Sequence, residues 1–72
     1  MPTNDKNDVR LTERELEVLR LIAAEKIDKE IALKLGVCER TVRYHLKNIN
    51  TKLETLTRVG AVAEALRLNL ID

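Results

Sequence analysis

A chain of 72 residues is long enough for one domain, and a chain this short buries only about 60% of the surface that its unfolded form exposes. Its composition is 44% apolar, Tyr44 is its only aromatic residue, and no run of alternating β-branched residues predicts a strand. The single Cys38 excludes an internal disulfide and a cysteine-based zinc site, and no apolar run reaches the roughly 18 residues of a membrane span. We therefore expect an all-α, soluble, cytoplasmic protein that does not enter a membrane.

The net charge of +1 conceals an uneven distribution of charge along the chain. Residues 38–53 carry four basic side chains against one acidic side chain, a net of +3. The segments on either side, residues 1–37 and 54–72, each sum to −1. One basic segment therefore lies between two slightly acidic ones.

Residues 1–10 are polar, contain the only proline and show no periodicity, which predicts a disordered tail or the remnant of a linker. We expect the ordered domain to span residues 11–72. Thr12 followed three residues later by Glu15 is the sequence of a capping box, so a helix is expected to begin there. Its buried face is predicted from apolar residues at helical spacing, namely Leu16, Val18, Leu19, Ile22 and Ala23.

A second, short helix is predicted after Asp28, which is a good N-cap residue, and Gly36 is expected to end it in a left-handed conformation. A third helix is predicted over residues 39–53. At about 100° per residue, its apolar side chains fall on one stripe of roughly 60° that is expected to be buried, namely Val42, Leu46, Ile49 and Leu53. A helix, a tight turn and a longer helix with a basic outer face form the arrangement that places a helix in the DNA major groove.

The opposite half of the third helix carries hydrogen-bond donors and no carboxylate, namely Arg40, Arg43, Tyr44, Lys47, Asn48 and Thr51. This surface predicts a negatively charged ligand. A pair of exposed cations could be no more than a solvated face, but their position in a helix-turn-helix favours contact with DNA.

A fourth helix is predicted after Thr57 as N-cap, with Asn69 as a left-handed residue at its end. Two apolar stripes run along it. We expect one of them to pack on the domain, namely Val59, Val62, Ala63, Leu66 and Leu70. The other is expected to contact a second copy of the chain, namely Ala61, Ala65 and Leu68.

The chain resembles the LuxR-type DNA-binding domain, also called GerE-like or NarL/FixJ-type, over residues 10–71. The resemblance is carried by LTERELEVLRLIAA, KEIALKLG, RTVRYHLKNINTKL and TRVGAVAEAL. It rests on family positions occupied here by Thr12, Glu15, Leu19, Glu30, Ile31, Ala32, Thr41, Val42, His45, Lys52, Leu53 and Arg58.

This resemblance implies a compact four-helix domain that binds double-stranded DNA sequence-specifically as a transcriptional regulator, with the third helix in the major groove. It implies base contacts by Arg43, Tyr44 and Lys47. Contacts to the DNA backbone are expected from Lys29, Arg40, Thr41, His45 and Lys52. It also implies a symmetric homodimer on an inverted repeat. The two copies could associate only when they are bound to DNA.

Two positions depart from the family pattern. Glu25 stands where the family usually has glycine, so it must accept a left-handed conformation or the first helix must end differently. Cys38 stands where a serine or threonine usually caps the third helix, and a thiol is a poorer acceptor for the free amides. A thiol at a helix N-terminus could also have a lowered pKa and sense redox state.

No catalytic arrangement emerges from the sequence. His45 has no metal-ligating residue three or four positions away on its helix, and a glycine-rich phosphate loop is missing because the only glycines are Gly36 and Gly60. We expect no enzyme activity, cofactor or metal. The main alternative to DNA binding is an adaptor, for example one that binds RNA polymerase, whose basic helix meets an acidic protein surface. A purely structural oligomerisation module would leave Arg43 and Lys47 without a role.

Overall fold

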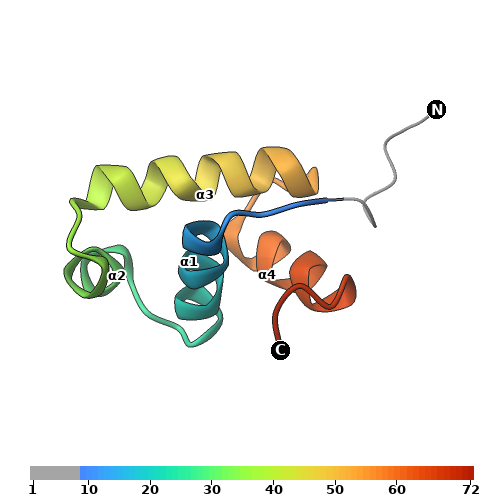
Figure 1. Ribbon diagram of the computed structural model, residues 1–72, viewed down its shortest axis with the longest axis horizontal. Coiled ribbons are helices and arrows are strands. Elements are labelled where there is room, and N and C mark those ends of the chain that lie inside the picture. Colours follow the sequence, from blue (N-terminus) through green and yellow to red (C-terminus); the bar gives the residue numbers. More distant parts are fainter. Residues whose placement is uncertain (1–8) are drawn as a thin grey trace.

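The computed structural model describes residues 9–72, and this part of the chain forms helices without any strand. The helices are α1 (Glu13–Ala23), α2 (Asp28–Leu35), α3 (Glu39–Leu53) and α4 (Arg58–Arg67). In Figure 1, α3 lies along one side of the domain, with α2 near its first residues, α1 across its middle and α4 near its end. The predicted all-α, four-helix fold is confirmed. None of the helices within residues 9–72 is both long and apolar enough to cross a membrane.

The start of α1 confirms the predicted capping box. The Glu15 amide donates to Thr12 Oγ1 at 3.0 Å, and the Thr12 amide donates to Glu15 Oε1 at 2.9 Å. These two bonds satisfy amides that would otherwise lack partners at the helix terminus. Most of the expected tail lies outside the described residues, and Val9 and Arg10 precede the first helix.

The start of α2 differs by one residue from the prediction. The N-cap is Ile27, whose amide donates to Glu30 Oε1 at 2.9 Å, and Asp28 is the first helical residue. The prediction that Asp28 caps this helix is therefore wrong, because its carboxylate is bound by Arg58. Gly36 ends α2 at φ 70°, as predicted, and the next amide, that of Val37, donates to Ala32 O at 3.0 Å.

A single core is formed where the inward faces of the four helices meet. The largest fully buried side chains are Val18, Leu19, Ile31, Val42, Ile49 and Leu53. The stripe predicted for α3 is confirmed, with Leu46 half-buried at its edge. This burial fixes which side of α3 faces solvent.

The alanine stripe of α4 faces the core, contrary to the prediction, while Val62 and Leu70 of the other stripe are half-buried against it. Ala61 and Ala65 are 0% exposed and belong to the core, whereas Val59 is 75% exposed and Leu66 is also exposed. The assignment of Ala61 and Ala65 to a surface contact with a second copy is therefore wrong, and Leu68 is half-buried against the core. The small alanine side chains allow the α4 backbone to approach the core closely, which leaves the larger apolar residues outside.

Within residues 9–72, three residues other than glycine have left-handed backbone conformations at helix ends. Glu25 has φ 65°, so it accepts the conformation for which the family usually uses glycine. Asn69 has φ 61°, as predicted, and Glu54 has φ 58° at the end of α3. Such conformations are uncommon outside glycine, so each of these ends carries a local cost that its capping bonds offset.

Candidate nucleic-acid interface

α2 and α3 form a unit in which α2 packs against α3 and supports it. α2 and α3 are joined by the short turn that Gly36 begins, and both contribute buried side chains to the same core. The buried stripe of α3 turns its opposite side outward. The outer surface of α3 is therefore set by packing rather than by the helix alone.

The first half of α3 carries an exposed basic surface. Arg40, Arg43 and Lys47 are exposed, and Tyr44 is 61% exposed between them. Thr41 and His45 are half-buried, and the rings of His45 and Tyr44 lie with centroids 6.1 Å apart. The predicted DNA-contacting residues of α3 named above therefore lie together on one helix. Lys29, which is also predicted to contact DNA, is exposed on the first turn of α2.

The N-cap of α3 confirms the expected weakness of Cys38. The thiol makes no cap bond to a backbone amide, and its Sγ lies 3.3 Å from Thr41 Oγ1. The hydrogen bond with the Thr41 side chain is the main cause that lowers the pKa of the exposed Cys38 thiol. Neither observation by itself identifies a ligand.

Arg43 has two acidic neighbours, Glu39 on its own helix and Asp28 on α2, of which only Glu39 follows from the sequence pattern of α3. Its Nη1 lies 3.9 Å from Asp28 Oδ2 and 3.9 Å from Glu39 Oε1. The other oxygen of the Asp28 carboxylate accepts a hydrogen bond from Arg58 Nη2 at 2.8 Å. The basic surface therefore has a carboxylate from α2 at its border.

Lys52, predicted to contact phosphate, is engaged inside the domain. Its Nζ donates to Glu15 Oε1 at 2.8 Å, and the Glu15 side chain is nearly buried. Burial alone would raise the pKa of Glu15, but hydrogen bonds from Lys52 and from the Thr12 amide outweigh it and lower that pKa. Lys52 thus joins the end of α3 to the start of α1.

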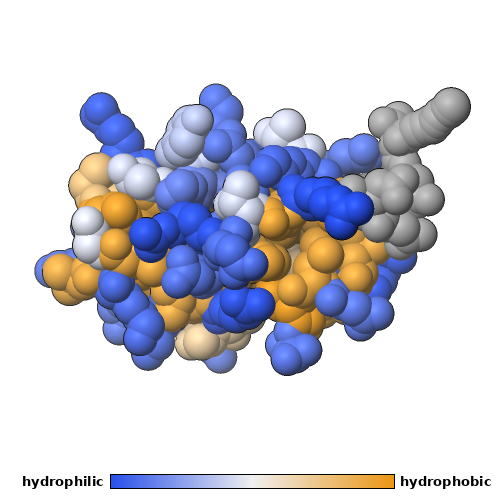
Figure 2. All heavy atoms as spheres, in the orientation of Figure 1, coloured by the Kyte–Doolittle hydropathy of each residue, from blue (hydrophilic) through white to orange (hydrophobic). Residues whose placement is uncertain are grey.

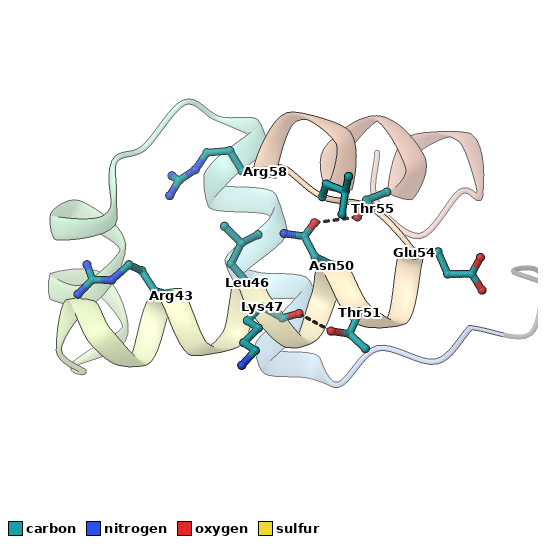
Figure 3. Close-up of a pocket in the computed structure, with 9 residues that line it drawn as sticks. Arg43, Leu46, Lys47, Asn50, Thr51, Glu54, Thr55 and Arg58 are labelled. Atoms are coloured by element: carbon teal, nitrogen blue, oxygen red, sulfur yellow. Dashed lines mark hydrogen bonds between the residues drawn. The ribbon is translucent and has the colours of Figure 1, made fainter.

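A hollow runs beside the outer surface of α3, toward the loop that leads to α4 (Figure 3). Within it, Thr55 Oγ1 donates to Asn50 Oδ1 at 2.7 Å, and Thr51 Oγ1 donates to the Lys47 carbonyl at 3.0 Å. Lys47 points away from the body of the domain, whereas Leu46 points toward it. The residues that line the hollow are Arg43, Leu46, Lys47, Asn50, Thr51, Glu54, Thr55, Leu56 and Arg58.

An apolar groove lies on another side of the domain, between α4 and the end of α1. Its α4 wall consists of Val59, Val62, Ala63 and Leu66. Opposite them, Ile27 is 60% exposed. Figure 2 shows mainly polar residues along α3, and apolar residues gathered toward α4 and, on the left, around α2.

A short helix, a turn that begins at a left-handed glycine and a longer helix with a basic outer face define a helix-turn-helix domain of the DNA-binding class. Residues 9–65 match the family described as bacterial regulatory proteins, luxR family. The chain therefore belongs to the luxR family of bacterial regulatory proteins. This result confirms the resemblance inferred from the four sequence segments.

Individual relatives agree with this membership. Spore germination protein GerE of Bacillus subtilis is 44% identical over 62 residues, which cover 86% of this chain and 84% of that protein. Transcriptional activator protein PhzR of Pseudomonas fluorescens is 45% identical over 64 residues, which cover 89% of this chain and 26% of that protein. Transcriptional regulatory protein LiaR of Bacillus subtilis is 44% identical over 62 residues, or 29% of its own length. The chain thus spans most of GerE but only a minor part of PhzR and LiaR.

Proposed function

We propose that this domain binds duplex DNA with a sequence preference and regulates transcription, with α3 lying in the major groove. The observation that carries this proposal is the exposed basic surface on the first half of α3, held outward by the buried stripe on its other side. Membership in a family of bacterial regulatory proteins supports the same role. Two of the relatives, PhzR and LiaR, are described as a transcriptional activator and a transcriptional regulatory protein, and we propose no catalytic activity for the chain.

Base contacts are assigned to Arg43, Tyr44 and Lys47, whose exposed side chains lie on consecutive turns of α3. Arginine and lysine donate well to the acceptors of guanine in the major groove, which is the commonest specific contact. Phosphate contacts are assigned to Lys29, Arg40, Thr41 and His45. Such contacts set the position of the domain on DNA without reading its sequence.

For Lys52 we propose a structural role in place of the expected phosphate contact. Its ammonium group lies 2.8 Å from the nearly buried Glu15 carboxylate, and turning to a phosphate would leave that carboxylate without its charged partner. The cost of that loss argues against Lys52 as part of the DNA interface.

The expected dimer contact is also replaced, by one on the outer side of α4. We propose that two copies of the chain meet across a two-fold axis, with the groove of one domain against the same groove of the other. The α4 wall of this groove consists of Val59, Val62, Ala63 and Leu66. The patch on one domain is small, so DNA is expected to be needed to hold the two copies together.

Selection of bound sequences from random duplex DNA tests the binding proposal. We expect an enriched consensus, and affinity for the selected duplex that falls steeply with salt. An inverted repeat in that consensus would support the symmetric dimer. Indifference to duplex DNA would instead favour the adaptor, in which the basic helix meets an acidic protein surface such as one on RNA polymerase.

The dimer contact is tested separately with Leu66→Glu, which places charge on the exposed side of α4. Leu33→Glu is the matched control, because Leu33 is exposed on α2 and does not line the groove. We expect Leu66→Glu to fold and to bind a half-site, but to lose cooperative binding to the full repeat. Cooperativity equal to that of the control would place the contact elsewhere.

A further inference from the structure

Asp28 lies between the beginnings of three helices, within reach of the first turn of α4 and the second turn of α3. It is the first residue of α2, its Oδ1 accepts from Arg58 at the start of α4, and its Oδ2 faces Arg43 of α3. Figure 3 shows the side chains of Arg43 and Arg58 both directed toward α2. A single carboxylate is thereby shared between an arginine of the proposed reading surface and an arginine outside it.

The charge of Asp28 is held in a fixed place. Its side chain is only 18% exposed, and the 2.8 Å bond from Arg58 restricts its movement. The N-terminal end of α2 also favours a negative charge at this position. Glu39 offers Arg43 a second carboxylate at 3.9 Å, but that side chain is 50% exposed and belongs to the same helix as Arg43.

The ion pairs of Arg43 are loose. Its Nη1 faces the two carboxylates, and both distances are 3.9 Å, longer than a hydrogen bond. A guanidinium has five N–H donors, so its remaining edge can bind a base while Asp28 stays in place. A move of Arg43 toward a phosphate, in contrast, would take the guanidinium away from a fixed negative charge that itself repels phosphate.

We propose that Asp28 is a positioning residue that raises the sequence specificity of DNA binding through Arg43. The inference rests on the proposed reading of bases by Arg43. Asp28 holds the guanidinium in an orientation suited to a base edge and disfavours its capture by phosphates. Its removal therefore strengthens binding to random DNA more than binding to the preferred site.

Asp28→Asn tests this inference, because it removes the charge with little change in shape. Affinities for the selected duplex and for random duplex are measured for the wild type, Asp28→Asn, Arg43→Ala and the double variant. Glu17→Gln is the matched control, since it neutralises an exposed carboxylate on α1 that pairs with Arg14. Asp28→Ser provides a second neutral variant with a residue favoured near helix starts, and thermal melts verify that each protein is folded.

We expect Asp28→Asn to bind random DNA about three- to fivefold more tightly, the scale of one exposed ion pair, with little change for the selected duplex. In the Arg43→Ala background the same substitution should leave the ratio of the two affinities unchanged. The inference is overturned if folded Asp28→Asn and Asp28→Ser discriminate between the two duplexes as well as Glu17→Gln does. It is also overturned if Asp28→Asn still lowers this discrimination in the Arg43→Ala background. Failure of the wild type to discriminate, or full discrimination by Arg43→Ala, would instead overturn the proposed function on which the inference rests.

Discussion

α3 and α4 both have one buried side and one exposed side, but they divide their residues differently. α3 buries Val42, Ile49 and Leu53 and exposes a basic, polar surface. α4 buries its small residues, Ala61 and Ala65, and exposes larger apolar ones. The caps also differ, because Thr57 Oγ1 accepts the Gly60 amide at 2.9 Å whereas Cys38 makes no bond to a backbone amide.

This difference indicates two kinds of surface on one small domain. The outer side of α3 can interact with an anion through charge and hydrogen bonds, which DNA supplies. The outer side of α4 has apolar groups that water solvates poorly, which suits contact with another protein surface. The two helices therefore point to separate partners, and substitutions should separate their contributions.

The largest effect is expected from Ala65→Glu, which puts a carboxylate into the core beneath α4. Ala65 is fully buried, so the substitution adds both volume and an unpaired charge, and we expect the domain not to fold. Circular dichroism and urea titration measure this, with Ala63→Glu on the exposed side of the same helix as control. Equal stability of the two variants would show that the two sides of α4 are assigned the wrong way round.

A smaller loss of stability is expected from Lys52→Met, which keeps the aliphatic stem and removes the ammonium group. The bond to Glu15 should contribute about 1–2 kcal/mol, since it involves charged groups but Lys52 is more than one third exposed. Denaturant melts measure the loss of stability, and Lys47→Met, at an exposed position of the same helix, is the control. Unchanged stability, with a salt slope of DNA binding lowered by about 1, would return Lys52 to the phosphate-contacting set.

The pKa of Glu15 predicts a pH dependence of folding. Because the folded state lowers this pKa below the ordinary value of about 4.3, Glu15 contributes stability above that pH and loses it as the pH falls through the folded-state pKa. Glu15→Gln should therefore show a shallower decline in unfolding free energy below about pH 4.5. Glu13→Gln, a change in the same helical turn, is the comparison, and a decline as steep as the wild type's in Glu15→Gln would contradict the assignment.

The smallest effect is expected at the start of α3. Cys38→Ser should stabilise the reduced protein by up to about 1 kcal/mol, because a hydroxyl accepts a backbone amide better than a thiol does. This change would make the cap of α3 resemble that of α4. Thermal melts decide the matter, and a serine variant that melts at a lower temperature would mean that the thiol packs or reacts in a way that the cap does not describe.

Local sequence patterns predicted most of the fold. The capping box of Thr12 and Glu15, the left-handed Gly36 and the cap at Thr57 each depend on residues a few positions apart. α3 has a single apolar stripe, so its buried side and its exposed cations followed from helical periodicity. The family resemblance added the expected roles of those exposed residues.

The remaining features depend on contacts between distant residues. α4 has two apolar stripes, and helical periodicity cannot tell which of them is buried. The alanine stripe is buried because its small side chains let the α4 backbone approach the core closely. Lys52 and Glu15 are 37 residues apart, and Arg58 and Asp28 are 30 residues apart, so neither pair leaves a signal in one helix. Local sequence predicts a cap at Asp28 because the partner that binds its carboxylate, Arg58, lies in a distant part of the chain.

The central claim is that the first half of α3 reads DNA sequence, and Lys47→Ala tests it most directly. Affinities for the selected duplex and for random duplex are compared with those of Lys34→Ala, which removes the same charge from the exposed end of α2. We predict that Lys47→Ala loses about 1–3 kcal/mol of discrimination between the two duplexes at unchanged thermal stability, whereas Lys34→Ala retains it. Equal discrimination by the two folded variants would contradict the assignment of sequence reading to this surface.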